Sequence, residues 1–82
     1  MADFKYEIKE GINEIIEEHG NGFTALREIS FNGRESNVDI RKWRTNSDGS
    51  EQMLKGCQLT HEGANRLVPI MTRVGFGRTK DV

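Results

Sequence analysis

The stretch Val38-Asp39-Ile40-Arg41-Lys42-Trp43-Arg44 carries the only tryptophan of this 82-residue chain, and its side chains alternate in kind. In a β-strand, successive side chains point to opposite faces of the sheet. Asp39, Arg41 and Trp43 are therefore predicted to share one face, with Lys42 on the other. A guanidinium beside a flat ring suits a nucleic-acid strand, because arginine binds phosphate through paired hydrogen bonds and any base can stack on tryptophan. The alternative is that Trp43 belongs to the hydrophobic core.

The N-terminal segment is predicted to form one long, interrupted strand. Apolar and charged residues alternate from 4 to 8, which is the pattern of a half-buried strand. The isoleucines of segment 12–18 are spaced as on a helix, but the segment is short, and isoleucine favours strands. We therefore expect the first strand to continue through this segment, past a bulge or kink at Gly11.

Two more runs complete a set of four expected strands. Residues 23–31 alternate strictly, and residues 51–59 contain four apolar residues around Lys55-Gly56, where a local irregularity is expected. Polar, glycine-containing turns separate the strands, at Gly20-Asn21-Gly22, Asn32-Gly33 and 45–50. Asn32-Gly33 is the strongest hairpin signal in the chain, because both residue types accept positive φ.

A single helix is predicted after the strands, from about 61 to 74. Thr60 is a good N-cap, Gly75 ends the segment, and Pro69 is expected to kink the helix axis. The apolar residues recur at the spacing of one helix face: Leu67, Ile70, Met71 and Val74. Residues 76–82 are expected to form a tail.

The expected fold is α+β, a curved four-stranded antiparallel β-sheet followed by one C-terminal α-helix. It forms a single domain over residues 1–82, with an ordered core from 4 to 74. An antiparallel sheet can bury one face and leave the other wet, and one helix is about the right cover for one face of a small sheet. We therefore expect the helix to cover one face and the face with Trp43 to be free for binding.

A homodimer is expected from the size of the chain. A domain this short buries a modest fraction of its surface, and the apolar side of the helix has only one small sheet to cover it. We expect the four apolar helix residues to lie in the dimer interface: Leu67, Ile70, Met71 and Val74.

Composition indicates a cytoplasmic protein with unevenly distributed charge. Residues 1–20 hold two lysines and six acidic residues, whereas the remaining 62 hold ten basic and seven acidic residues, so the net charge of −1 conceals a mildly basic body. The single Cys57 excludes an intrachain disulfide and favours a reducing compartment. No apolar run approaches the roughly 20 residues of a membrane span, and the N-terminus lacks the pattern of a signal peptide.

Taken in series, three segments of this chain resemble the single-stranded DNA-binding domain of transcriptional positive cofactor four, and more closely its bacterial YdbC-type relatives. These segments are Ile29-Ser30-Phe31-Asn32-Gly33, Val38-Asp39-Ile40-Arg41-Lys42-Trp43 and Leu54-Lys55-Gly56-Cys57-Gln58-Leu59-Thr60. The resemblance covers roughly residues 4–74. It implies a curved four-stranded sheet followed by a helix, and two copies that pair through helices and strands into a symmetric dimer with a single-strand groove.

The resemblance also implies roles for individual residues. Trp43 and Phe31 would stack on bases, and three basic residues would meet the nucleic-acid backbone: Arg41, Arg34 and Lys55. Arg27 is added with less support, because basic residues on the second strand of the family vary in place. His61, Gly63 and Cys57 depart from the family pattern. The implied function is largely sequence-independent binding of single-stranded DNA in transcription, replication or repair, and the coactivator role of the eukaryotic protein does not transfer.

Catalysis is not expected. Cys57, His19 and His61 would have to supply it, but nothing in the sequence places them together, and neither metal-ligand spacing nor a cofactor motif is present. We expect Cys57 to be a small buried residue and both histidines to lie on the surface. Two alternatives stay open: single-stranded RNA as the ligand, and a protein-interaction dimer whose aromatic patch binds another protein.

Overall fold

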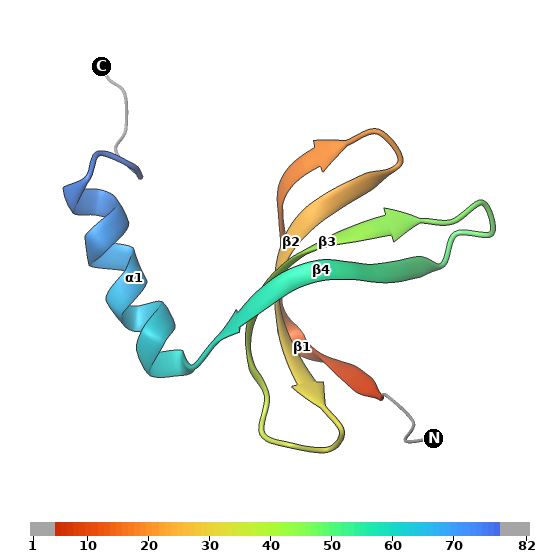
Figure 1. The fold of residues 1–82 in the computed structure, drawn as a ribbon, viewed down its shortest axis with the longest axis horizontal. Coiled ribbons are helices and arrows are strands. Elements are labelled where there is room, and N and C mark those ends of the chain that lie inside the picture. Colours follow the sequence, from red (N-terminus) through yellow and green to blue (C-terminus); the bar gives the residue numbers. More distant parts are fainter. Residues whose placement is uncertain (1–4, 78–82) are drawn as a thin grey trace.

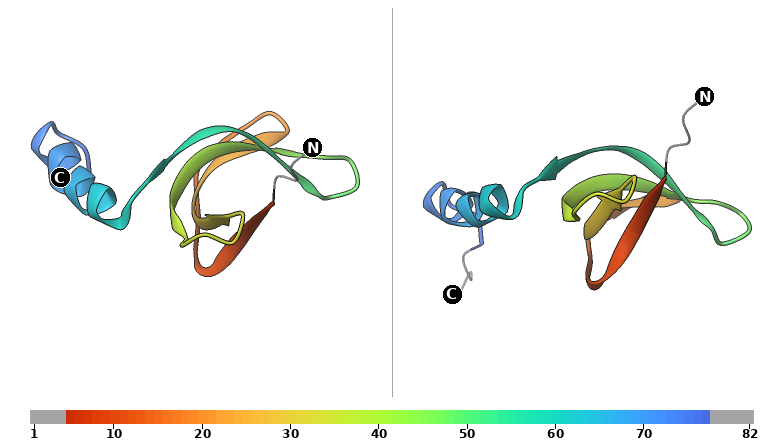
Figure 2. Two further views of the ribbon diagram at one scale, coloured as in Figure 1. Left: turned by 60° about the horizontal axis from the view of Figure 1, so that its bottom comes forward. Right: turned by 90° about the horizontal axis from the view of Figure 1, so that it is seen from below.

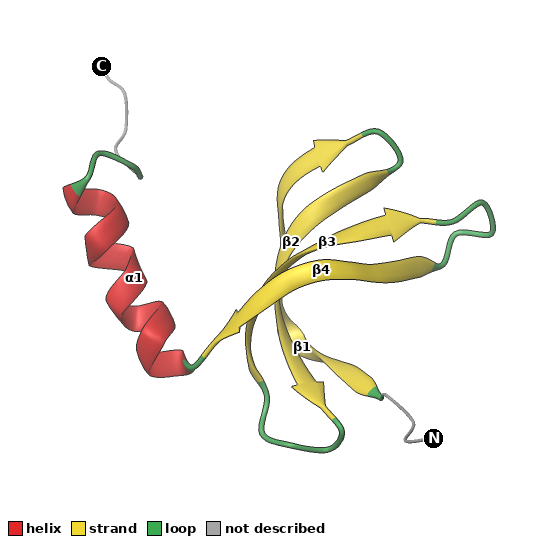
Figure 3. Cartoon of the chain, in the orientation of Figure 1, coloured by secondary structure: helices red, strands yellow, loops and turns green. Residues whose placement is uncertain are grey.

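The computed structural model of the chain describes residues 5–77 and has the predicted order of elements. The elements are β1 (Tyr6–His19), β2 (Gly22–Phe31), β3 (Asn37–Thr45), β4 (Glu51–Leu59) and α1 (His61–Arg73). The four strands lie in sequence order in one antiparallel sheet, and α1 follows the last strand (Figures 1 and 3). Of the expected tail, Phe76 is exposed, and residues 78–82 lie outside the described part of the chain.

The long first strand is confirmed, including its irregularity at Gly11. β1 runs unbroken through Gly11, whose φ is +119°, and its pairing with β2 shifts register between Ile8 and Asn13. Residues other than glycine rarely adopt such a φ, so glycine allows the strand to bend here. The bend contributes to a sheet that curls strongly around one of its faces (Figure 2). We call this inner face the concave face and the opposite one the outer face.

The turn at Asn32-Gly33 is also confirmed. Asn32 and Gly33 have φ of 53° and 77°, and the N–H of Arg34 donates to the carbonyl of Phe31 over 3.0 Å. The Asn32 side chain accepts from the N–H of Lys5 over 3.1 Å, while the N–H of Asn32 donates to the carbonyl of Lys5 over 2.8 Å. The turn therefore also fixes the beginning of β1 against the end of β2.

The core lies on the concave face and is small. It consists of Phe23, Ala25 and Ile29 from β2 with Trp43 from β3, and the half-buried Phe31 and Met53 pack against it. Phe23 and Trp43 are directly paired across the two strands. The alternation predicted for β3 is confirmed, because Asp39 and Arg41 share this face with Trp43.

α1 begins and ends as the sequence indicates. The Thr60 hydroxyl accepts from the N–H of Gly63 over 3.0 Å, which caps the N-terminus. At the C-terminus, the N–H groups of Gly75 and Phe76 donate to the carbonyls of Thr72 and Met71, a pattern that requires the positive φ of Gly75. Pro69 lies inside the helix without dividing it.

The expectation that α1 covers one face of the sheet is wrong. α1 stands beside the sheet, its backbone comes close only to β3 and β4 among the described strands, and none of its own residues is buried (Figure 1). The reason lies in the connection, since Thr60 alone separates Leu59 of β4 from His61 of α1. A one-residue connection leaves no length for the helix to turn back over the sheet. Within residues 5–77, no helix has the length and apolar character to cross a membrane.

A side-chain bridge ties the start of α1 to the sheet. The His61 ring nitrogen Nε2 lies 2.7 Å from Oε2 of Glu28 on β2, and the Ser36 hydroxyl donates to the same oxygen over 3.1 Å. These hydrogen bonds, that of His61 first, lower the pKa of Glu28 below its ordinary value. The lowered pKa means that the charged form of Glu28 stabilises this arrangement.

We predict that the His61→Ala variant raises the pKa of Glu28 back toward the ordinary glutamate value, because the hydrogen bond that lowers this pKa most is lost. In the wild-type protein, the stabilising contribution of Glu28 should be complete above the ordinary glutamate pKa and decline as pH falls through the lowered one. The carboxyl chemical shift of Glu28, followed by NMR during acid titration, measures both proteins. An unchanged Glu28 pKa in His61→Ala would contradict the bridge.

Gly56 is required where β3 and β4 lose their regular register. The pairing shifts between Arg41 and Trp43, which confirms the irregularity predicted at Lys55-Gly56. A Cβ on Gly56 would lie 1.8 Å from Cβ and 2.5 Å from Cα of Arg41. Backbone atoms of a central strand cannot move aside as a flexible side chain can.

We predict that Gly56→Ala lowers the free energy of unfolding by about 1–3 kcal/mol through this overlap. Gly63→Ala is the matched control, because the closest atom to its Cβ would be the Thr60 hydroxyl at 3.3 Å, and the change should stay within about 1 kcal/mol. Urea denaturation of the two variants measures the difference. Equal stabilities would show that the bulge accommodates a side chain.

Candidate nucleic-acid interface

Four aromatic residues gather on the concave face, and we call them the aromatic cluster: Tyr6, Phe23, Phe31 and Trp43. The ring centroids of Tyr6 and Phe31 lie 6.3 Å apart, and those of Tyr6 and Trp43 lie 6.0 Å apart with the planes at 61°. The cluster draws on three strands, because Tyr6 is paired with Phe31 and Phe23 with Trp43. Tyr6 was missed as a site residue, although its place in the alternating segment 4–8 was the available signal.

Only part of the aromatic cluster is reachable from solvent. Tyr6 is 37% exposed and Phe31 is half-buried, whereas Phe23 is buried and Trp43 is only 1% exposed. The expectation of a free face around Trp43 is thus wrong for this conformation, because the sheet curls and other side chains cover the ring. Tyr6 and Phe31 are the rings that an arriving ligand meets first.

Arg41 is held by a buried carboxylate on the same strand. Its Nε and Nη2 donate to the two oxygens of Asp39 over 2.7 Å each, and its Nη1 donates to the carbonyl of Leu54 over 3.2 Å. Asp39 is completely buried. The guanidinium carbon lies 5.4 Å from the centre of the Phe31 ring, within the range of a cation–π contact. A guanidinium has five N–H groups, so these bonds leave two N–H groups of Arg41 for another acceptor.

Arg27 lies inside the concave face and not on its surface. It is 5% exposed, and its guanidinium carbon lies 4.6 Å from the centre of the Trp43 ring and 5.4 Å from that of Phe23. Its Nε donates to the Asn13 side chain over 2.8 Å, and its Nη1 lies 3.1 Å from a carboxylate oxygen of Glu51. Arg27 is therefore enclosed in this conformation.

The two remaining basic candidates are exposed and lie apart from the rings. Arg34 lies in the turn that follows Phe31, and its carbonyl accepts from the Ser30 hydroxyl. Lys55 lies at the bulge of β4, where it lines a shallow hollow together with Arg41 and Lys42. The structure thus brings Arg27, Phe31, Arg41 and Trp43 together. Lys55 lines a hollow with Arg41, and also with Lys42, which alternation assigns to the other face.

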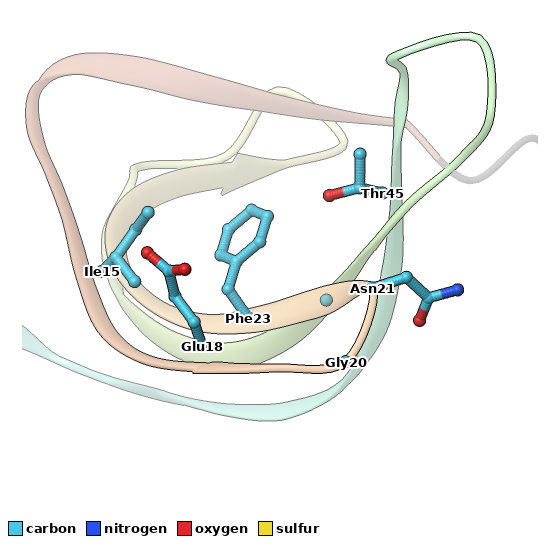
Figure 4. A pocket seen from close by; sticks show the side chains of 7 residues that line it. Ile15, Glu18, Gly20, Asn21, Phe23 and Thr45 are labelled. Atoms are coloured by element: carbon cyan, nitrogen blue, oxygen red, sulfur yellow. The ribbon is translucent and has the colours of Figure 1, made fainter.

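A second hollow, of about 480 Å³, opens at the end of the concave face that lies opposite the paired residues Tyr6 and Phe31. Figure 4 shows the Phe23 ring standing between Ile15 and Glu18 on one side and Thr45 on the other. The Glu18 carboxylate would repel a phosphate group here. Phosphate contacts are therefore favoured at the end of the face where Tyr6, Phe31 and Arg41 lie.

The outer face carries an apolar groove of about 310 Å³ between the sheet and α1. Apolar side chains line it from both sides: Ile12, Ile16, Leu26, Val38, Ile40 and Leu59 from the sheet, and Ala64, Leu67, Val68 and Met71 from α1. Of the four predicted interface residues, Leu67 and Met71 line the groove, while Ile70 and Val74 are exposed beside it. Val68, which the sequence pattern did not single out, is 66% exposed.

The thiol and the two histidines do not form a cluster. Cys57 is exposed on β4, so the expectation that it is buried is wrong: it lies on the outer face, which α1 does not cover. His19 pairs with the Thr24 hydroxyl over 3.1 Å and His61 with Glu28, both on the surface as expected. Among residues 5–77, no group of three acidic, histidine or cysteine side chains is arranged to hold a metal ion.

Searches with this chain against protein-family models, curated protein sequences and solved structures gave no match.

Proposed function

We propose that this protein binds single strands of nucleic acid, without catalysis and largely without regard to sequence, through the aromatic cluster and its arginines. The observation that carries the proposal is the pairing of reachable rings with a fixed guanidinium, where Arg41 stacks on Phe31 beside the exposed Tyr6. Stacked bases and charged phosphates need these two groups side by side, because rings hold the bases and guanidinium N–H groups hold the backbone.

The geometry favours single strands over duplexes. In a duplex the base faces are already stacked on their neighbours, so Tyr6 and Phe31 would find no free surface to contact. α1, moreover, is not a major-groove reader, since its apolar side lines the groove on the outer face. DNA is the proposed ligand, as the resemblance to positive cofactor four implies, and single-stranded RNA offers the same stacking and phosphate chemistry.

We predict that Tyr6→Ala or Phe31→Ala weakens binding of an unstructured oligothymidine by about 1–3 kcal/mol while the salt dependence stays nearly unchanged. Lys55→Ala should instead flatten the slope of log affinity against log salt by about 0.7, because the proposal assigns Lys55 to a phosphate. Salt titrations followed by Trp43 fluorescence measure both effects, with oligouridine and a duplex of matched length for comparison.

Arg66→Ala is the control for loss of one positive charge, because Arg66 lies on α1 away from the concave face and should leave the slope unchanged. Equal affinity for duplex and single strand at the same salt concentration would contradict stacking on unpaired bases. Absence of binding to every oligonucleotide would favour the alternative, an aromatic patch that binds another protein.

We further propose that two copies pair through the outer face and α1. Among residues 5–77 the buried apolar cluster holds four residues, which is little for a chain of this length, while ten apolar side chains line an outer groove that stays open. Each Å² of apolar surface removed from water contributes about 25 cal/mol, so covering this groove would add substantially to stability. A second copy of the chain is the proposed partner, because two-fold homodimers are the commonest oligomers. In such a pair the same groove of each copy faces the other.

We predict that Met71→Glu converts the dimer to monomer and lowers the unfolding midpoint in the same variant, because it places a charge in the apolar groove. Arg66→Glu introduces the same side chain on the opposite side of α1 and should leave the association state unchanged. Sedimentation equilibrium at micromolar concentration measures the mass. A stable wild-type monomer would contradict the pairing.

A further inference from the structure

Arg27 occupies the position on Trp43 where a ligand ring would stack. Its guanidinium lies over the indole and also over the Phe23 ring, so a planar, positively charged group contacts two rings inside the concave face. Trp43 is 1% exposed as a result of this and of Tyr6, whose ring edge meets it. A base reaching Trp43 would have to displace Arg27 first.

The enclosed arrangement leaves two donors unsatisfied in one place. Within the described part of the chain, neither Nε1 of Trp43 nor Nη1 of Arg27 has a hydrogen-bond partner, although both atoms are buried. Nη1 lies 3.1 Å from Glu51, but no N–H points at the carboxylate at an acceptable angle. Buried donors without acceptors are costly, so an acceptor-rich ligand entering here would relieve both.

The groups that hold Arg27 are weak and accessible. Asn13 supplies one neutral hydrogen bond from β1, next to the register shift of that strand. The Glu51 side chain is 38% exposed and stands at the beginning of β4, so water and ions reach it. A phosphate can therefore compete with Glu51 for the guanidinium.

We infer that Arg27 is a displaceable placeholder: in the free protein it covers Trp43 and pairs with Glu51, and on binding it moves from the ring to a phosphate of the entering strand, whose base takes its place on Trp43. Nothing covalent changes; one ion pair is exchanged for another. The inference rests on the proposed function and adds to it a closed site that opens only to a ligand bearing both a planar base and a phosphate.

Glu51→Gln is the decisive variant. It removes the carboxylate that competes with the phosphate, and it does not alter the Arg27 residue itself. We expect it to bind oligothymidine about two- to fivefold more tightly, as the loss of a partly exposed ion pair implies. In the free variant, acrylamide should quench Trp43 fluorescence more strongly than in the wild type. Arg27→Gln should likewise expose Trp43 to acrylamide, while flattening the salt slope by about 0.7.

Glu18→Gln is the matched control, because Glu18 lines the hollow beside Phe23 and, within the described chain, makes no ion pair with Arg27. Removing its charge tests simple repulsion of the strand, and Trp43 quenching should not change. If Glu51→Gln binds no more tightly than Glu18→Gln, and Trp43 quenching is equal in both, the inference that a ligand displaces Arg27 from Trp43 is overturned.

The wild-type protein provides a test that needs no variant to fold. The Arg27 Hε proton lies in the ring currents of Trp43, so its NMR shift should move toward the ordinary arginine position when oligothymidine is added. Binding with this shift unchanged would overturn the placeholder and leave the proposed function standing. Absence of binding to any oligonucleotide would overturn both.

Discussion

The packing of Trp43 on the concave face holds three of the four strands in their curled arrangement. Phe23 and Arg27 of β2 contact its ring from one side, and Tyr6 of β1 meets it edge-on. The buried apolar cluster is small, and Trp43 is its largest member. The curl that encloses Trp43 is also what withdraws it from solvent, so the same packing that stabilises the sheet restricts the binding face.

The two faces of the sheet differ in the side chains they carry. The concave face combines rings with guanidinium groups that contact Asp39, Asn13 and Glu51, so it is suited to a charged planar ligand. The outer face is apolar and joins α1 through a groove that one copy of the chain leaves open. The one-residue connection at Thr60 decides this division, because a longer loop would let α1 close over its own sheet.

The sequence was sufficient for the elements and their order but not for their curvature. Period-two alternation, the turn residues and the caps of α1 are local signals, and each depends on a few neighbouring residues such as Gly11 or Asn32. Alternation assigns Trp43 and Arg41 to one face, yet it does not say whether that face becomes concave and enclosed. That outcome depends on non-local pairing between β1 and β2, which also brings Tyr6 into the aromatic cluster. Cys57 was placed wrongly for the same reason, because its burial depended on where α1 would lie.

The presence of an arginine at position 27 is not explained by stability. Burying a guanidinium costs several kcal/mol before its partners compensate, and an aliphatic side chain of similar size is often as stable or more so in such a place. Within residues 5–77 Arg27 is moreover incompletely compensated, since its Nη1 has an ion-pair partner in Glu51 but no hydrogen bond, and the indole N–H of Trp43 has no acceptor. Asp39 and Arg41 provide the contrast within the same face, because there both carboxylate oxygens are matched by N–H groups over 2.7 Å. A fully matched pair is what a purely structural role produces, so the unmatched Arg27 is better understood as one state of a side chain that has a second partner.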